Sequence, residues 1–233
     1  MRTTRALNTD GVEQRLEATT YDRWFDSPWG QYAFNVEVGV VLEEMGPLSA
    51  SVSVLDVGCG TGRFTARLEA SGASVVGLDI DPAMLDLAAM RTHGHLILGD
   101  AEAIPVPDGV FDRVVAVTLC EFAHDPGQVF AELARVTRPG GRIVVAALNP
   151  RSPWGLRERH WLHRDPWRGV RFLSRQKLLA LGSPFGRISI RGALCAPGPF
   201  PGLQTLGPMF ERLGSLVPVF GAFQVVTIQR SEP

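Results

Sequence analysis

The sequence predicts an α/β protein with a Rossmann-like, doubly wound sheet of mostly parallel strands. From about Ser51, short β-branched runs alternate with helical stretches, which is typical of parallel strands joined by crossover helices. A glycine cluster follows the first of these runs, as expected where a buried strand turns into a helix. Asp81-Pro82 and Asp125-Pro126 each provide a capping side chain and a proline suited to the first helical position.

The elements follow in order from this pattern. Compact apolar runs predict strands at 52–57, 74–79, 95–98, 111–118 and 142–148. Helices are expected at 61–71, from Asp81 onward, and from Asp125 through Arg138, where Pro139-Gly140-Gly141 ends the last one. The expected buried face of the second helix consists of Met84, Leu85, Leu87 and Ala88.

The flanking segments complete a single domain over residues 1–233. Residues 12–46 read as a helical N-terminal lid with a break near Ser27-Pro28, ahead of a core at 51–150. In the C-terminal part, 151–233, we expect an irregular Arg/Trp stretch at 151–172 and a short helix at 174–181. Two further strands are expected at 188–194 and 223–230, with the loop 197–201 (PGPFP) between them.

The composition is that of an ordinary globular chain, 45% hydrophobic and 20% charged. No apolar stretch of about 18 residues predicts a membrane span, and the N-terminus has no hydrophobic signal segment. Cys59, Cys120 and Cys195 lie far apart without a CxxC pair, which argues against a disulfide framework and a zinc ribbon. We therefore expect a cytoplasmic protein without a metal site.

The near-neutral net charge of −1 conceals a division along the chain. Residues 1–150 hold 11 basic and 20 acidic residues, and residues 151–233 hold 12 and 4. Between Arg151 and Lys177, 8 basic residues accompany 2 acidic ones and three tryptophans. This stretch suits a solvated face paired with the acidic half, an anionic small substrate or an anionic membrane surface. Nucleic acid is not expected, because no RNA-binding module adjoins the segment.

The glycine-rich turn after the first strand indicates the class of ligand. Gly58, Gly60 and Gly62 form GxGxG, which differs from the GxGxxG of nicotinamide dinucleotide sites and from the P-loop pattern. Asp56 just before the turn would repel a pyrophosphate but pair with a ligand ammonium. Asp79 ends the second strand, where a carboxylate can accept both ribose hydroxyls, and Asp100 ends the third, within reach of an adenine amino group. S-adenosylmethionine meets these requirements.

Four segments together resemble one enzyme family. They are VLDVGCGTGRFT (54–65), VVGLDIDPAML (75–85), GDAEAIPVPDGVFDRVVA (99–116) and VFAELARVTRPGGRIVVA (129–146), in order over about 95 residues. The chain resembles class I S-adenosylmethionine-dependent methyltransferases, in the type 11 branch that includes the ubiquinone and menaquinone biosynthesis enzymes. The resemblance implies a seven-stranded sheet whose last strand, at 223–230, is antiparallel.

The resemblance also implies where the cofactor binds. Backbone atoms of Thr118 and Leu119 are expected near the methionine moiety, and Tyr21 of an N-terminal Tyr-Asp element is expected to reach the cofactor. The remaining expected contacts are Asp56, Gly58, Cys59, Gly60, Asp79, Ile80, Asp100 and Ala101.

The methyl acceptor is expected beyond the fourth strand, where Glu121 and His124 are candidate bases. Their alternative roles are a capping carboxylate and a surface histidine. Two aromatic segments are candidate walls of an acceptor pocket or, equally, packing of the lid on the sheet. Their members are Trp24, Phe25 and Trp29 in the first segment and Trp154, His160 and Trp161 in the second.

Methyl transfer to a small molecule is the function that these features favour. Asn/Asp-Pro-Pro-Tyr is absent after the fourth strand, where Thr118-Leu119-Cys120-Glu121 stands, and this disfavours methylation of DNA amino groups. The alternatives are a methyltransferase acting on a quinone or lipid at a membrane surface, and a non-catalytic nucleotide-binding or scaffold protein with the same fold.

Overall fold

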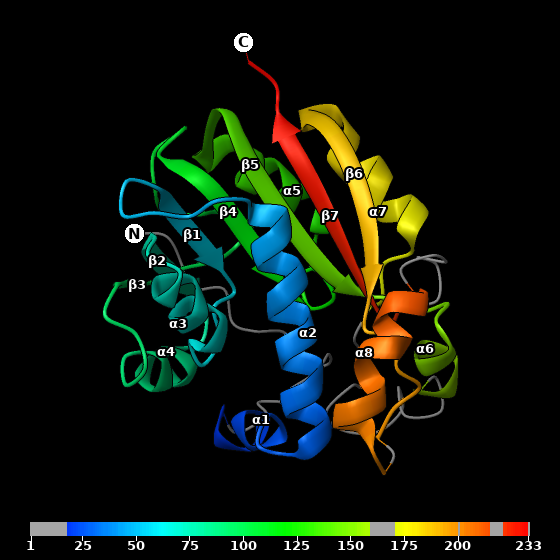
Figure 1. The fold of residues 1–233 in the computed structure, drawn as a ribbon. Helices are drawn as coiled ribbons and strands as arrows, with labels where there is room; N and C mark the ends of the chain where they lie inside the picture. The colour runs from blue at the N-terminus through cyan, green and yellow to red at the C-terminus, as the bar shows by residue number, and fades with distance from the viewer. Residues whose placement is uncertain (1–17, 159–170, 200, 215–220, 233) are drawn as a thin grey trace.

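Seven strands form one sheet in the order β3-β2-β1-β4-β5-β7-β6 in a computed structural model (Figure 1). The structure describes residues 18–158, 171–199, 201–214 and 221–232. The strands are β1 (Ser53–Val57), β2 (Ser74–Asp79), β3 (His95–Leu98), β4 (Phe111–Val117), β5 (Thr137–Leu148), β6 (Gly186–Ala193) and β7 (Phe223–Arg230).

Only the last strand runs against the others. β1 to β5 pair in parallel, whereas β7 is antiparallel to both β5 and β6. In Figure 1 the arrowheads of β5 and β6 point toward the bottom and that of β7 points toward the top. The expected mostly parallel sheet with an antiparallel last strand is confirmed.

Helices cover both faces of the sheet. They are α1 (Ala18–Trp24), α2 (Pro28–Met45), α3 (Arg63–Ala70), α4 (Pro82–Ala88), α5 (Pro126–Val136), α6 (Pro153–Glu158), α7 (Arg175–Gly182) and α8 (Leu203–Gly214), with a short 3₁₀ turn at Ser183–Phe185. Alternate strand residues divide the core: Leu55 and Val57 pack with α5 and α7, whereas Val54 packs with α2 and α3. The sheet is therefore buried on both sides.

Three helices begin at a capping residue followed by proline, two of them at the predicted pairs Asp81-Pro82 and Asp125-Pro126. Ser27, Asp81 and Asp125 each accept a backbone N–H from the first turn of their helix. The break between α1 and α2 falls at Ser27-Pro28 as expected. On α4 only Ala88 is fully buried, and the other three expected core side chains, Met84, Leu85 and Leu87, are half-buried.

Two local predictions are wrong, and one helix was not predicted. α5 ends at Val136 and β5 starts at Thr137, so Pro139-Gly140-Gly141 belongs to the strand, beside an irregularity in the pairing of β4 with β5. The stretch 151–172 is not irregular throughout, because α6 begins at Pro153, where the Ser152 hydroxyl accepts the Gly155 N–H. α8 was not expected between the last two strands.

None of the described helices is long and apolar enough to cross a membrane.

Candidate functional site

The glycine turn lies at the carboxyl ends of the parallel strands, the edge at which open α/β sheets bind ligands. The backbone N–H groups of Gly58 and Cys59 both donate to the carbonyl of Leu78, at 2.7 and 2.9 Å, and tie the end of β1 to β2. At Gly58, with φ +73°, a Cβ would lie 2.8 Å from Leu119 Cδ1. At Gly60, with φ +53°, a Cβ would meet nothing within 4 Å, so open space lies over the bare backbone.

Asp79 holds this turn in place. Its Oδ2 accepts the Gly60 N–H at 2.7 Å, and its Oδ1 accepts the Asp81 N–H at 3.0 Å. Burial raises the pKa of the Asp79 carboxyl, although these backbone N–H groups act against the shift. One side chain at the end of β2 therefore fixes both the glycine turn and the start of α4.

A small pocket of about 50 Å³ opens beside the turn. Seven of the predicted site residues line it: Tyr21, Phe25, Asp56, Gly58, Cys59, Gly60 and Thr118. Its other lining residues are Glu37, Thr61, Arg63, Phe64 and Val117. The fold thus brings α1, α2, β1, α3 and the end of β4 to one place.

Buried carboxyl groups form part of the pocket wall. Asp56 is 1% exposed and accepts a hydrogen bond from Thr65 Oγ1 at 2.7 Å. Burial raises the pKa of Asp56 to about 7, and the nearby Asp79 adds to the shift. Burial, followed by the charge of Glu121, raises the pKa of Glu37 to about 8. The pocket therefore gains negative charge when these groups ionise.

Cys59 and Tyr21 also sit in this acidic environment. Burial and the charges of Asp56 and Asp79 raise the pKa of the Cys59 thiol well above its usual range, so the thiol stays protonated. Burial and the charge of Glu37 likewise hold the pKa of Tyr21 high. Neither group is a nucleophile in this setting, and both present neutral surface to the pocket.

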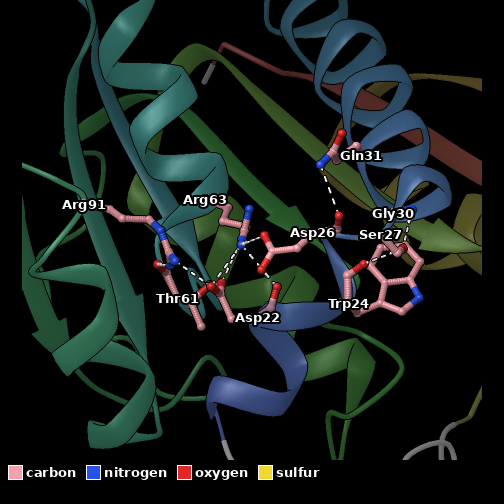
Figure 2. Close-up of polar contacts among 9 residues, drawn as sticks. All are labelled: Asp22, Trp24, Asp26, Ser27, Gly30, Gln31, Thr61, Arg63 and Arg91. Atoms are coloured by element: carbon pink, nitrogen blue, oxygen red, sulfur yellow. Dashed lines mark hydrogen bonds and ion pairs between the residues drawn. The ribbon is translucent and has the colours of Figure 1, made fainter. Parts of the chain in front are cut away.

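The lid is fastened to the glycine turn by one carboxylate, Asp22 of α1 (Figure 2). Its oxygens accept hydrogen bonds from Arg63 Nε at 2.7 Å, Arg91 Nη2 at 2.5 Å and Thr61 Oγ1 at 2.7 Å. Burial opposes ionisation of Asp22, but the hydrogen bond from Arg63 and those from Thr61 and Arg91 outweigh it and lower the pKa to about 2. We refer to Asp22, Thr61, Arg63 and Arg91 as the Asp22 clamp.

The end of β4 enters the pocket with an unusual backbone. Thr118 has φ +48°, a conformation that non-glycine residues rarely adopt and that often marks functional sites. Its N–H donates to the Ala146 carbonyl at 2.8 Å, and its neighbour Leu119 packs over Gly58. Thr118 lines the pocket and Leu119 supports the turn from the side.

Besides Asp79 and Leu119, described above, three predicted cofactor residues do not line the small pocket and follow the ends of β2 and β3. Ile80 is 63% exposed, and Asp100 is exposed, with its Oδ1 accepting the Glu102 N–H at 2.8 Å. Ala101 is half-buried against the core. Leu98, at the end of β3, is also 60% exposed, so Ile80 and Leu98 present exposed apolar side chains near the ends of β2 and β3.

The two candidate bases differ in their surroundings. Glu121 is 1% exposed and accepts the Leu148 N–H at 2.6 Å through Oε1. Burial raises its pKa to about 7 despite this hydrogen bond. His124 is exposed just ahead of α5, and its carbonyl accepts a hydrogen bond from Arg171. The fold places Glu121 toward the interior and His124 at the surface.

The aromatic candidates are spread over three places. Phe25 lines the pocket under the Arg63 guanidinium, 5.0 Å from the ring centre, and Trp24 packs edge-on against Phe25 with 42% exposure. Trp29 stacks on Tyr32 and lines a separate cavity of about 230 Å³ with Pro199 and Leu203. Trp154 lies in α6. His160 and Trp161 lie outside the described residues.

Glu37, Arg63 and Arg91 were not predicted as site residues. Glu37 occupies the buried face of α2 with Ala33 and Val41, each four positions away, so helical periodicity could have identified it. Arg63 and Arg91 have no comparable signal, because their role depends on α1 lying against the start of α3 and the end of α4.

The sequence around this site is similar to that of known methyltransferases. Residues 55–145 match a family model described as a methyltransferase domain. The malonyl-[acyl-carrier protein] O-methyltransferase of Serratia marcescens is 36% identical over 140 residues, which cover 60% of this chain and 55% of that protein. The protein of that name from Yersinia pestis is 33% identical over 138 residues, 59% of this chain and 52% of that protein. The chain thus spans about half the length of these curated relatives.

Solved structures share the whole fold at low identity. An S-adenosylmethionine-dependent methyltransferase of Thermotoga maritima aligns with a TM-score of 0.71 and 23% identity, covering 91% of this chain and 96% of that one. Phosphoethanolamine N-methyltransferase 2 of Haemonchus contortus, in complex with S-adenosyl-L-methionine, aligns with a TM-score of 0.69 and 14% identity, covering 94% and 59%. These likenesses establish the fold.

Proposed function

We infer that this chain, a class I S-adenosylmethionine-dependent methyltransferase by the sequence of its core and by its fold, transfers the methyl group of S-adenosylmethionine to a small-molecule acceptor. One observation carries the proposal: the GxGxG turn, held by Asp79, borders a pocket walled by the buried carboxyls of Asp56 and Glu37. Such a wall suits a ligand with positive charges and no phosphate.

The residues present fit this cofactor. The open space over Gly60 allows a ligand to approach the backbone closely. Asp79 directs each oxygen to a backbone N–H and retains lone pairs for two ribose hydroxyls. The exposed side chains of Ile80 and Leu98 offer apolar cover for a base, with Asp100 alongside.

The proposed roles of the chain's own groups follow from these contacts. The carboxylate of Asp56 faces the cationic end of the ligand. Because its pKa is raised, a proton competes with the ligand for this carboxylate. Thr118 presents its backbone at the inner end of the pocket, and Tyr21 and Phe25 of the lid exclude water there. The bound cofactor supplies a sulfonium methyl with a good leaving group, so positioning of the acceptor accounts for most of the catalysis.

The proposal specifies only the chemical class of the methyl acceptor. The two relatives named above carry names that specify malonyl-[acyl-carrier protein]. The site favours a small organic molecule beside Tyr21, Phe25 and Phe64. Nothing in the described residues favours the membrane-surface or scaffold alternatives.

The domain division and the location of the protein remain predictions from the sequence. We propose one domain in which 12–46 is the lid, 51–150 binds the cofactor and 151–233 faces the acceptor. A reducing cytoplasm is consistent with Cys59, Cys120 and Cys195 being free thiols.

Isothermal titration calorimetry tests the cofactor assignment. The chain should bind S-adenosylmethionine and S-adenosylhomocysteine, and bind NADH poorly. Asp79→Ala should make the binding free energy of both adenosyl ligands less favourable by about 1.5–3 kcal/mol, because charged hydrogen bonds to the ribose are lost. Asp86→Ala, at an exposed position of the neighbouring helix α4, is the matched control and should bind as the wild type does. Tight binding of NADH without binding of either adenosyl ligand would refute the assignment.

A further inference from the structure

Glu37 is an acidic side chain on the apolar face of α2. It is 8% exposed and lines the same pocket as the glycine turn. Its neighbours on the helix, Ala33, Val38 and Val41, are buried in the core. Burying a carboxyl in this position opposes folding, so the fold retains a group that packing alone does not require.

The negative charge of Glu121 adds to burial in raising the pKa of Glu37. Oε1 of Glu121 is bonded to the Leu148 N–H, which anchors the side chain to the end of β5. Oε2 is buried and has no hydrogen-bond partner among the described residues, although buried polar atoms are paired as a rule. The fold therefore presents one oxygen that lacks a proton donor.

The groups around Glu37 are mostly acidic or neutral. Tyr21 faces it from α1, Asp56 lies across the pocket on β1, and Glu121 follows β4. Arg63 is the basic residue among the lining residues, and Asp22 and Asp26 already engage its guanidinium. A carboxylate or phosphate acceptor would meet like charges here, with no uncommitted cation among the described lining residues.

We propose that Glu37 is the acceptor-binding base of this pocket, that Glu121 is its positioning residue, and that the acceptor is an amine. This inference rests on the methyl transfer proposed above and adds its substrate class. An ammonium group supplies a positive charge and N–H donors to a pocket in which Arg63, the basic lining residue, is already paired with Asp22 and Asp26.

The proposed step balances in atoms and charge. The bound ammonium passes one proton to a carboxylate oxygen of Glu37, which becomes a neutral acid. The nitrogen lone pair then forms a bond to the sulfonium methyl carbon, while the electron pair of the carbon–sulfur bond goes to sulfur and leaves a neutral thioether. The methylated amine carries the positive charge away, and Glu37 returns its proton to solvent.

The first test compares acceptor classes on matched scaffolds. The full chain is incubated with S-adenosylmethionine and with benzylamine, benzyl alcohol and benzoate, then with hexylamine, hexanol and hexanoate. Mass spectrometry measures methylated product. Transfer to the amines in preference to their isosteres supports the proposal. Transfer to the carboxylate or the alcohol first, or to neither amine, overturns it.

The second test compares three substitutions with the preferred amine. Glu37→Gln should lower kcat by about 10²–10⁴-fold, since a general base is removed. Glu121→Gln should keep most of kcat and move the acid limb of the pH profile to lower pH, because loss of a neighbouring negative charge lowers the pKa of Glu37. Glu43→Gln, exposed on the same helix, is the matched control. A Glu37→Gln enzyme with unchanged kcat and pH profile would overturn the role of Glu37.

A third measurement does not depend on activity. In protein labelled with ¹³C at its glutamate carboxyls, two signals should titrate near pH 7–8, far above the usual value of about 4.3. Both should be altered in either variant and retained in Glu43→Gln. Titration of all glutamate signals in the ordinary range would overturn the pairing.

Calorimetry with S-adenosylhomocysteine separates this proposal from the cofactor assignment. Glu121→Gln, which does not alter a residue lining the pocket, should bind this ligand within about threefold of the wild type, which also shows that it is folded. A thermal melt should show that Glu37→Gln is folded. If the wild type itself fails to bind it, the proposed function fails. If binding is intact and amines are not methylated, only the acceptor inference fails.

Discussion

At the scale of single residues, Asp56 links the occupancy of the pocket to protonation. Burial and the neighbouring Asp79 raise its pKa to about 7, and Thr65 is the hydrogen-bond partner of its Oδ2. A cationic ligand favours the ionised form and lowers that pKa again, so binding releases a proton at pH values below about 7.

The affinity for S-adenosylmethionine should therefore increase between pH 6 and pH 8. Calorimetry in two buffers with different ionisation enthalpies measures the proton released on binding. Asp56→Asn should abolish most of that release and weaken binding by about 1.5–3 kcal/mol, because a neutral amide replaces the charged partner of the ligand. Binding of undiminished strength with unchanged proton release would remove Asp56 from the site.

A site residue could be predicted from the sequence where its contacts join neighbouring segments of the chain, and not where they join distant ones. Gly58, Gly60 and Asp79 follow from local spacing, because strand, turn and helix are adjacent in sequence. Glu37 lies 21 positions before Gly58; helical periodicity places it on the buried face of α2, but only packing of α2 on the sheet brings it to the pocket. The Asp22 clamp joins residues 39 to 69 positions apart, and these contacts carry no local signal.

At the scale of elements, the corner between α1 and α2 controls how the lid covers the pocket. Ser27 caps α2 through the Gly30 N–H, and its own hydroxyl donates to the Trp24 carbonyl at 2.7 Å (Figure 2). A Cβ on Gly30 would lie 2.1 Å from that carbonyl oxygen. The close approach of the two helices thus requires glycine at this position.

Breaking the Asp22 clamp should loosen α1. Asp22→Ala leaves Arg63 and Arg91 without their shared carboxylate and should lower the free energy of unfolding by about 2 kcal/mol, in line with the depressed pKa of Asp22. Hydrogen exchange in 18–30 should be faster than in the wild type. Asp26→Ala removes only the exposed second partner of Arg63 and should have little effect. Equal effects of the two substitutions would contradict the clamp.

Two glycines of α2 provide a matched pair. Gly30→Ala forces apart α1 and α2 and should destabilise the protein by about 1–3 kcal/mol. A Cβ at the exposed Gly39 would meet no atom within 4 Å. Gly39→Ala should therefore stabilise the protein by about 0.5–1 kcal/mol, because alanine favours the helix. Thermal melts with both variants measure the difference. A change in stability of the same sign in both variants would show that the corner does not depend on Gly30.

The missed elements have identifiable causes. Ser152-Pro153 is the same start signal as Ser27-Pro28, but the Arg/Trp-rich sequence after it has no apolar period. α8 contains Gly207 and Pro208, which usually interrupt helices. Gly207 is required there because a Cβ would lie 2.4 Å from the Tyr32 ring. Tertiary packing on α2 thus overrides local helix propensity.

At the scale of the whole molecule, the carboxyl groups divide into two sets with opposite effects on stability. Burial raises the pKa values of Glu37, Asp56 and Glu121, so their contribution is fully present below about pH 4 and is lost as pH rises toward 8. Hydrogen bonds and ion pairs lower the pKa values of Asp22 and Asp112, whose contribution is lost as pH falls below about 4.

The ligand-free protein should consequently be most stable near pH 5. Each carboxyl in the raised set changes the free energy of unfolding by up to about 1.4 kcal/mol per pH unit within its window. Calorimetric melts from pH 4 to pH 9 should show Tm falling on the alkaline side. Replacing Glu37, Asp56 and Glu121 with their amides should flatten that decline. A Tm that rises from pH 5 to pH 8 would contradict the raised pKa values.

The Asp22 clamp also determines how dissolved salt affects ligand exchange. Tyr21 and Phe25 wall the pocket from α1, and α1 is held to α3 and α4 by ion pairs whose side chains are 15–31% exposed. The paired nitrogen and oxygen atoms lie 2.5–2.7 Å apart, well inside the Debye length of about 10 Å at 0.1 M, so mobile ions screen these pairs little. The exchange of a pocket ligand should therefore depend only weakly on the electrolyte.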